Sequence, residues 1–486
     1  MKKKIAIIGS GFAALAAASY LAQAGHSVSI YEKNETLGGR ARRLSKDGFH
    51  FDMGPTWYWM PDVFEKFFGD FGKTTSDFYK LHKLAPAYRV YFSKDDNVTI
   101  SDNLSDIVKT FESIEKGSGA KLEKFIKIAQ KNYQIAVGEM VYKPGDSVLE
   151  LVSLETILRV NQFFSTISTD VRRQFKDERL RQILEFPVLF LGAKPSDTPS
   201  FYSFMNFADF GLGTWHPEKG MYSVVEAMVG LAKGLGVTFK TNAAVSEIIV
   251  ENNAATGIVV NGERIVADIV LSGADYHHTE TLLQPKYRMY SEAYWDKKVF
   301  APSSLLFYVG FDKEVDRVVH HSLFFDTPFA PHAVEIYDSK VWPKKPLFYA
   351  SFPSKTDSFF APKGKEAAIF LIPIAPGLED TPEIREKYFD IIMERLEEIT
   401  NQKLKKYVIL KESFCVNDFV NDYNSYKGNA YGLANVLTQT AFLRPKIKSK
   451  KVANLFFTGQ LTVPGPGVPP SLISGKIVSD KILKTI

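Results

Sequence analysis

The first thirty residues alternate between apolar runs and short polar breaks in a pattern that predicts a strand, a helix and a second strand. Ile5–Ile8 is an apolar run typical of a buried parallel strand, and a glycine turn separates it from an alanine-rich helical stretch. Ser27–Tyr31 has the alternation and the β-branched residues of a second strand. Together these segments predict a βαβ unit on a parallel sheet.

The turn after the first strand has the residues of a phosphate-binding loop. Gly9 permits a tight turn, Gly11 lets the backbone approach a pyrophosphate, and Ala14 replaces a third glycine where a small residue is needed. The helix N-terminus would face the phosphates. Glu32 follows the second strand, where a carboxylate can accept hydrogen bonds from ribose hydroxyls. A glycine turn with a purely structural role is the alternative.

A second glycine loop follows Glu32 in the stretch "KNETLGGRARR". Lys33 comes directly after the acid, and Gly38, Gly39 and Arg40 form a close-approach loop with a guanidinium placed to meet phosphate oxygens. Simple NAD dehydrogenases do not need such a loop, whereas an extended FAD must be held at its middle. The loop therefore favours FAD, with Lys33, Gly39 and Arg40 among its ligands.

An aromatic turn, "FHFDMGPTWYW", comes next. Gly54 and Pro55 turn the chain, and the four residues that follow are expected to wall the isoalloxazine ring: Thr56, Trp57, Tyr58 and Trp59. An aromatic corner of the core, without a ligand, would show the same composition.

The chain ends on "NLFFTGQLTVPGPGVPPSLISGK". The apolar start predicts a strand that brings Gly459 to the cofactor, and the proline- and glycine-rich part predicts a rigid wall. A helix is expected from Ser471, with Pro469 and Pro470 fixing its entry and Ser471 capping nearby amides. A terminal helix that only closes the domain is the alternative.

These motifs resemble the bacterial-type phytoene desaturases, which are FAD enzymes of the carotenoid pathway. The resemblance rests on the stretches above, on "NDYNSYKGNAYGLANVLTQTAFLRP" and on "LSGADYHHTE", and covers nearly the whole chain. It implies that Val245 meets the adenine edge and that Val468 contacts the flavin. One departure is that Pro469, Pro470, Ser471 and Leu472 stand where many relatives have a glycine and a run of small residues.

The resemblance implies desaturation of phytoene toward lycopene by hydride transfer to the flavin. Another carotenoid desaturase, either a 1-hydroxycarotenoid 3,4-desaturase or a diapophytoene desaturase, uses the same cofactor chemistry, and a flavin amine oxidase is a more distant alternative. A flavin-binding protein without catalysis remains a further one. Quinone or oxygen is the expected electron acceptor. The second proton could go to a flavin atom, to a side chain such as Asp422 or Tyr426, or to water, and the sequence does not choose among them.

The pattern predicts an α/β fold in which a Rossmann-like FAD-binding domain is built from discontinuous segments and accompanied by a mixed α+β substrate domain. Residues 1–80, 211–289 and 411–486 are expected to form the FAD-binding domain. In the middle segment, alternating runs with Asn/Gly turns predict a set of strands. Residues 81–210 and 290–410 are expected to form the substrate and membrane-contact domain.

Composition supports an apolar ligand. Aromatic residues make up 13% of the 486 residues, whereas the net charge is only +5 and is spread along the chain, which argues against a nucleic-acid partner. Cys415 is the single cysteine, so no disulfide forms within the chain and a reducing compartment fits. No metal site is expected, because His277 and His278 lack the spacing of a metal motif.

The segment from Arg172 to Trp215 predicts a membrane contact and a substrate channel. Five cations between Arg172 and Arg181 precede an aromatic-rich stretch, a combination that suits peripheral contact with anionic lipid, although a solvated basic face beside ordinary core is equally compatible. The residues expected to line the substrate channel are Trp57, Tyr202, Phe204, Phe207 and Trp215.

The N-terminus superficially imitates a signal peptide, with three lysines before an uncharged stretch that ends in "AQA". Gly9 and Gly11 interrupt the apolar run, and the second strand follows in register with a βαβ unit, so we expect no signal peptide. The sequence contains no run of 18 apolar residues, so it predicts no membrane-spanning helix. The expected location is the cytoplasmic side of a membrane, as a peripheral protein.

Overall fold

A five-stranded parallel sheet brings together strands from distant parts of the chain. The computed structural model describes residues 1–151 and 158–486. In spatial order the sheet contains β19 (Leu455–Phe457), β13 (Ile269–Ser272), β1 (Lys4–Ile8), β2 (Ser27–Tyr31) and β9 (Thr238–Lys240). β1 lies at its centre, where Ile5 pairs with both Val28 and Ile269. The predicted N-terminal βαβ unit is therefore confirmed.

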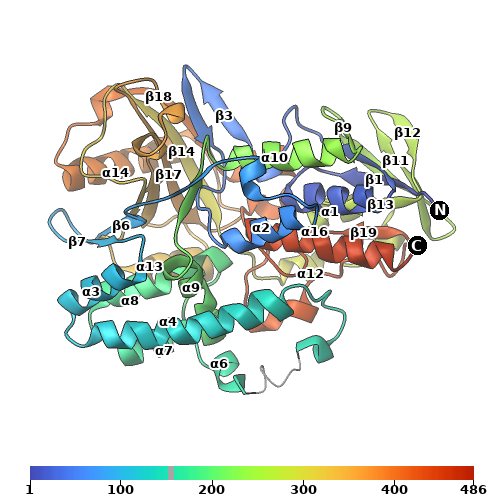
Figure 1. Cartoon of the computed structure of the whole chain (residues 1–486). Coiled ribbons are helices and arrows are strands. Elements are labelled where there is room, and N and C mark those ends of the chain that lie inside the picture. Colours follow the sequence, from blue (N-terminus) through green and yellow to red (C-terminus); the bar gives the residue numbers. More distant parts are fainter. Residues whose placement is uncertain (152–157) are drawn as a thin grey trace.

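Helices from both ends of the chain cover one face of this sheet. α1 (Phe12–Gln23), α10 (Met221–Gly234) and α16 (Val468–Leu483) lie side by side there, and both termini lie on the same side of the molecule (Figure 1). A Cβ at Gly475 would lie 2.6 Å from the carbonyl oxygen of Ala13 and 2.6 Å from Cβ of Ala16. Because Gly475 has no side chain, the first and last helices touch backbone to backbone.

An antiparallel layer covers the other face. It contains β10 (Val245–Glu251), β11 (Ala254–Val260) and β12 (Glu263–Val266), followed by α11 (Tyr276–Thr281) and α12 (Glu292–Asp296). Ile248 and Ile258 pack with Val270 of the parallel sheet and with Trp295 of α12. The strands predicted for this segment are confirmed.

A seven-stranded mixed sheet forms the second lobe (Figure 1). In spatial order it contains β18 (Val408–Phe414), β14 (Ser303–Phe311), β17 (Glu366–Ile374), β16 (Phe348–Ser351), β15 (His321–Phe324), β6 (Tyr88–Tyr91) and β7 (Asn97–Ile100). Every residue of β14 is buried, because α14 (Pro382–Thr400) packs on one face and the hairpin of β3 (Arg43–Lys46) and β4 (Phe49–Asp52) on the other. β18 runs across the domain boundary predicted after residue 410.

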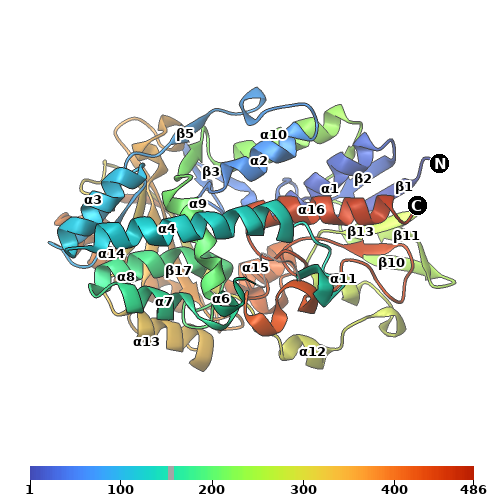
Figure 2. The same ribbon diagram turned by 60° about the horizontal axis from the view of Figure 1, so that its bottom comes forward.

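A helical layer completes the second lobe. It contains α3 (Leu104–Ile114), α4 (Ser118–Ile135), α6 (Val160–Phe164), α7 (Ile167–Gln174), α8 (Glu178–Glu185) and α9 (Phe204–Phe210). The long α4 runs across this layer (Figure 2) and packs against α3 and α9. The remaining helices and strands are α2 (Pro61–Gly69), β5 (Leu81–Lys83), β8 (Trp215–Pro217), α13 (Phe329–Ala333), which lies between β15 and β16 in sequence, and α15 (Val416–Tyr423). The arrangement confirms the predicted fold class.

Candidate cofactor and substrate site

One large cavity joins the two lobes. It has a volume of about 970 Å³ and begins at the carboxyl ends of β1, β2, β13 and β19, which contribute Gly9, Glu32, Gly273 and Gly459. The carboxyl ends of parallel strands are where open α/β sheets bind their ligands. From there the cavity continues between the seven-stranded sheet and the helical layer. It therefore has a polar end on the parallel sheet and an apolar end in the second lobe.

The β1–α1 turn leaves helix amides free to meet an anion. Gly9 has a φ of +87°, a conformation that favours glycine, and its N–H donates to the carbonyl of Tyr31 at 2.8 Å. No side chain caps α1 at Gly11, and a Cβ there would meet nothing within 4 Å. Ala14 lies outside the cavity lining. It packs under Gly273, where a Cβ would come within 2.8 Å of Cβ of Ala14.

Glu32 is held rigidly at the end of β2. Its buried carboxylate accepts hydrogen bonds from the N–H of Ser10 (3.0 Å), the hydroxyl of Ser10 (2.7 Å) and the N–H of Asn34 (2.9 Å). A carboxylate offers about four acceptor positions, so one remains for a ribose hydroxyl. Lys33, beside it, donates to the carbonyl of Asn421 and to Oδ1 of Asn424 at 3.3 Å.

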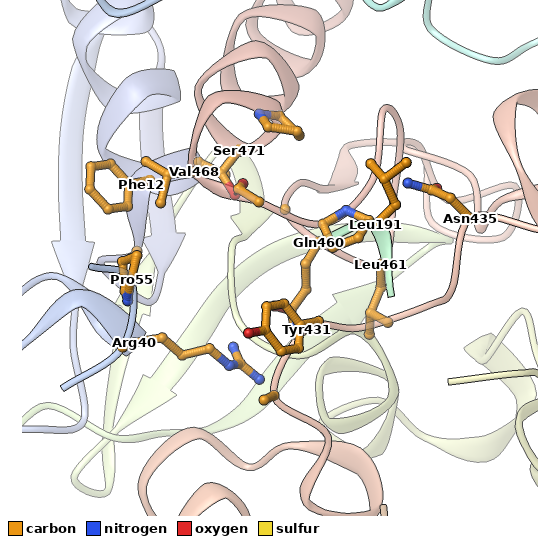
Figure 3. A pocket seen from close by; sticks show the side chains of 18 of the residues that line it. Phe12, Arg40, Pro55, Leu191, Tyr431, Asn435, Gln460, Leu461, Val468 and Ser471 are labelled. Atoms are coloured by element: carbon orange, nitrogen blue, oxygen red, sulfur yellow. The ribbon is translucent and has the colours of Figure 1, made fainter. Parts of the chain in front are cut away.

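The second glycine loop rests directly on the first. A Cβ at Gly39 would lie 3.3 Å from Cα of Gly11, and a Cβ at Gly54 would lie only 2.2 Å from the carbonyl oxygen of Arg40. The half-buried side chain of Arg40 reaches toward Tyr431 and Gln460 (Figure 3). Its Nη2 donates to Ser425 at 2.9 Å, whereas its Nε has no partner.

These features fit a dinucleotide. An unpartnered guanidinium nitrogen, uncapped helix amides and glycines without room for a side chain converge on one end of the cavity. Phosphate oxygens are the ligands that such donors prefer. Burial lowers the pKa of Arg40 from its ordinary value, and Asp275 opposes that shift.

The C-terminal segment closes this end of the cavity with a short turn. Gly459 has a φ of +109°, and its N–H donates to Oγ of Ser474 at 3.0 Å. α16 begins at Val468, three residues earlier than predicted, so Pro469 and Pro470 lie inside its first turn. The predicted cap at Ser471 is wrong, since its hydroxyl donates to the carbonyl of Gly467 at 2.8 Å. Prolines lack an N–H, so the first turn presents only that of Val468.

Most of the predicted site residues line the cavity. Those in its lining are Gly9, Gly11, Glu32, Lys33, Gly39, Arg40, Gly54, Pro55, Thr56, Trp57, Tyr202, Phe204, Val245, Asp422, Gly459 and Val468.

Three further candidates lie outside the lining. Phe207 packs against Tyr133 with ring centroids 5.4 Å apart. Trp215 donates from Nε1 to the carbonyl of Leu212 at 2.9 Å, and Tyr426 donates to Asp296 at 2.8 Å.

The second lobe contributes lining residues that the sequence reasoning missed. Leu323 and Phe325 come from the end of β15, and Leu347, Phe348 and Tyr349 from β16. The stretches "HHSLFF" and "PLFYAS" are rich in aromatic residues between polar breaks, a signal that predicts strands. Their position beside the cofactor end depends on pairing with β6 and β17, which are far away in sequence.

Comparison with known proteins identifies the family. A model of the "Flavin containing amine oxidoreductase" family matches residues 12–483. The chain is 40% identical to the carotenoid 3,4-desaturase of Haloarcula japonica, over 99% of this chain and 98% of that protein. The chain belongs to the carotenoid desaturases.

Two other members of this family match over nearly the whole chain. The zeta-carotene-forming phytoene desaturase of Myxococcus xanthus is 32% identical and covers 99% of this chain and 94% of that protein. A 4,4'-diapophytoene desaturase of Staphylococcus aureus is 33% identical, with 99% of each covered. The family uses a flavin, and the polar end of the cavity fits one.

Solved structures share the fold. An oxidoreductase from Methanosarcina mazei superposes with a TM-score of 0.64 at 19% identity, over 99% of this chain and 100% of the other. Putrescine oxidase with bound putrescine superposes with a TM-score of 0.61 at 13% identity, over 100% of this chain and 99% of the other. At these identities the likeness concerns the fold alone.

Proposed function

We propose that the chain is an FAD-dependent desaturase that removes two hydrogens from adjacent carbons of a long carotenoid. The observation that carries the proposal is 40% identity to a carotenoid desaturase along nearly the whole chain, joined to a cavity with one dinucleotide-like end and one apolar end. A bound flavin would supply the hydride acceptor. Of the protein's own groups, Glu32 would bind the ribose, the β1–α1 turn and Arg40 the pyrophosphate, and Val245 the adenine edge.

The apolar end would orient the substrate and exclude water. A polyene precursor offers no polar handle near the reacting carbons, so shape must hold it. Tyr202 and Phe204 lie on one side of the cavity, and Trp57 and Phe325 line it as well. Positioning of this kind can supply ~7 to 11 kcal/mol of the barrier.

We further propose 3,4-desaturation as the reaction, because identity to the 3,4-desaturase (40%) exceeds identity to the phytoene desaturase (32%). Conversion of phytoene toward lycopene is the second candidate, and the 32% identity to the phytoene desaturase supports it. Expressing the chain in cells that make only phytoene, and separately in cells that make a late carotenoid, tests both. New terminal double bonds in the second strain alone support 3,4-desaturation. Coloured products in the first strain favour phytoene, and no conversion in either strain contradicts the proposal.

Reoxidation by a quinone or by oxygen completes the proposed cycle. Flavin reduced anaerobically by substrate should regain its oxidised spectrum on addition of one of the two. A reduced flavin that persists in the presence of both would contradict this part of the proposal.

The ion pairs that the basic residues of the Arg172–Arg181 segment form do not support the membrane contact predicted for them. Arg172 forms ion pairs with Glu178 (2.8 Å) and Glu185 (3.1 Å), and Arg179 with Asp96 (3.0 Å) and Asp177 (2.8 Å). Arg173 and Arg181 are likewise paired with acidic side chains of neighbouring turns. Neutralised in this way, the cluster offers little charge to anionic lipid.

We propose instead that the apolar rim of the cavity opening contacts a lipid bilayer. Leu437 and Leu443 both line the cavity and are 44% and 40% exposed. Nearby, Phe163 lines the cavity while its neighbour Phe164 is 83% exposed. Exposed apolar side chains around an opening are typical of membrane or ligand contact, and the carotenoid substrate resides in lipid. Within the described ranges, no helix has both the length and the apolar character of a membrane span.

Vesicle flotation tests this contact. The double variant Phe164→Ser with Leu443→Ser should lose binding to phospholipid vesicles. Val266→Ser serves as the matched control, because Val266 is 63% exposed on β12, in the other lobe. Equal flotation of the double variant and the control would contradict the proposal.

A further inference from the structure

A polar path leads from the cavity into the second lobe. Thr56 and Tyr349 both line the cavity, and their hydroxyl oxygens lie 2.8 Å apart. Oη of Tyr349 lies 2.6 Å from Nδ1 of His321, which is fully buried on β15. Nε2 of His321 has no hydrogen-bond partner. A buried imidazole with one nitrogen unsatisfied costs free energy, which calls for a role beyond packing.

Desaturation requires such a path, because the second hydrogen leaves the substrate as a proton in an apolar cavity. We propose that Thr56, Tyr349 and His321 form the relay that takes up this proton, an inference that rests on the proposed desaturation. Tyr349 is the catalytic residue, since it faces the cavity. Thr56 and His321 act through it as positioning and proton-holding partners.

The step balances as follows in atoms and electrons. One carbon of the substrate would give up a hydrogen with its electron pair, for which a bound flavin would supply the acceptor. The neighbouring C–H bond gives its electron pair to the new double bond, and its proton goes to Oη of Tyr349. The proton already on that oxygen moves to Nδ1 of His321. The phenol is thereby restored, and the imidazole carries the positive charge.

The protonation states suit this direction of transfer. Burial raises the pKa of Tyr349, so the phenol keeps its proton to donate. Burial, together with the charge of His216, lowers the pKa of His321, so the imidazole is neutral before the reaction and has a lone pair to accept with. The indole of Trp57 lies parallel to the His321 ring, with centroids 4.0 Å apart and planes 9° apart. An aromatic face at this distance stabilises an imidazolium once it forms.

Two further histidines lie behind His321 and lead away from the cavity. The ring of His320 lies 4.5 Å from that of His321, and the ring of His216 lies 4.7 Å from that of His320. Nε2 of His216 is 3.2 Å from a carboxylate oxygen of Asp357, which also accepts from the N–H of Lys219, an exposed contact. These are ring contacts, and no hydrogen bond joins Nε2 of His321 to the two rings, so the relay proper ends at His321.

The other basic groups in the cavity lining are less suitable acceptors. The carboxylates that line the cavity are Glu32, Glu150, Asp275 and Asp422. Three of them belong to the dinucleotide end: Glu32 ends β2, Asp275 follows β13, and the backbone carbonyl of Asp422 accepts from Asn34. Asp422 is also ion-paired with Arg42. The fourth, Glu150, accepts from the N–H groups of Gly145 and Asp146.

His332 lines the cavity, but both of its ring nitrogens already have hydrogen-bond partners. Its Nε2 donates to the carbonyl of Pro373 at 3.0 Å, and its Nδ1 accepts from the N–H of Leu347 at 3.0 Å. Tyr426, the other candidate from the sequence, lies outside the lining and bonds to Asp296. His278 also lines the cavity, but its Nε2 lies 3.1 Å from the side-chain amide nitrogen of Asn424, and it sits in α11 at the dinucleotide end. Among these described carboxylates and histidines, the Tyr349–His321 pair is thus the favoured acceptor.

The test is to reduce the holoenzyme with its carotenoid in an anaerobic single turnover and to monitor the reduction through the absorbance of the flavin. Tyr349→Phe should slow reduction by roughly 10²- to 10⁴-fold, the usual contribution of a proton-transferring group. Flavin content and substrate affinity should stay unchanged, and deuterium at the proton-losing carbon should slow Tyr349→Phe more than wild type. His321→Gln should resemble Tyr349→Phe.

Tyr308→Phe is the matched control. Tyr308 is also buried in the same sheet, donates to the carbonyl of Met53 at 2.8 Å and lies outside the cavity lining. It should reduce its flavin at the wild-type rate. A Tyr349→Phe rate within about threefold of wild type would overturn the relay, while wild type that is never reduced by any carotenoid would overturn the proposed function instead.

A second measurement needs no turnover. In protein labelled with ¹⁵N-histidine, the Nδ1 resonance of His321, assigned by its absence from His321→Gln, should move in Tyr349→Phe and stay in place in Tyr308→Phe. An unmoved resonance in Tyr349→Phe would mean that the hydrogen bond on which the relay depends does not form.

Discussion

Replacing Asp209 by asparagine should make the protein more stable, and increasingly so as the pH rises. Asp209 of α9 is buried, its carboxylate accepts a hydrogen bond from Tyr88 at 2.7 Å, and burial raises its pKa from 3.8 to about 7. The folded protein therefore binds a proton there that the unfolded chain has released. The stability from this group is fully present below pH 4 and is lost as the pH rises through 7.

The size of the effect follows from the shift. A difference of about three pKa units at about 1.36 kcal/mol each corresponds to roughly 4 kcal/mol of unfolding free energy lost between pH 4 and pH 8. Asp209→Asn keeps an acceptor for Tyr88 and carries no charge to bury. Its stability relative to wild type should thus increase by roughly 4 kcal/mol over the same range.

Urea unfolding followed by tryptophan fluorescence, repeated at several pH values, measures this difference. Tyr88→Phe gives an independent check: it removes the donor that favours the ionised carboxylate, so the pH at which stability is lost should rise further. The reasoning is refuted if the stability difference between Asp209→Asn and wild type is the same at pH 4 and pH 8.

Three further substitutions address the cofactor site and its supporting helices. Glu32→Ala leaves three hydrogen-bond donors without an acceptor, each at a cost of about 1 to 3 kcal/mol. The variant should purify with less flavin per chain, measured by absorbance, and full flavin occupancy would argue against a ribose-binding role. Gly54→Ala forces the Arg40 carbonyl aside and should also lower flavin content, with unchanged content contradicting the tight contact. Gly475→Ala should destabilise the fold by about 1 to 3 kcal/mol in urea unfolding, because its Cβ has no room against α1. The matched change Gly230→Ala, with nothing within 4 Å in α10, should stabilise by about 0.5 to 1 kcal/mol; equal effects at Gly475 and Gly230 would contradict the packing argument.

The sequence predicted the features that depend on neighbours along the chain. The βαβ unit follows from local periodicity, and so do the positions of Gly9 and Glu32 directly after two of its strands. The predicted start of α16 is three residues too late, because Pro469 and Pro470 indicate a turn in the sequence. Proline is nevertheless tolerated in the first helical turn, since N–H groups there have no partner within the helix.

Features that depend on contacts between residues far apart in the chain could not be predicted from the sequence. Tyr349 reaches the cavity because β16 pairs with β15, which in turn pairs with β6, some 230 residues earlier. The sequence predicts an exposed basic face at the arginines before the aromatic-rich stretch, although acidic partners such as Asp170 for Arg173 and Glu178 for Arg181 lie only three residues away. The pairing with a residue far away in the sequence could not be predicted. Arg179, for example, pairs with Asp96, 83 residues away. Neither periodicity nor composition carries this information.

The backbone contact between α1 and α16 has a consequence for how the protein is made. The N-terminal βαβ unit leaves the ribosome early, yet Gly475, its packing partner, lies 444 residues after Tyr31. At about 5 to 20 residues per second, this leaves the first helix without its cover for roughly 20 to 90 s. A chain that ends before Gly475 therefore lacks the backbone contact that covers α1.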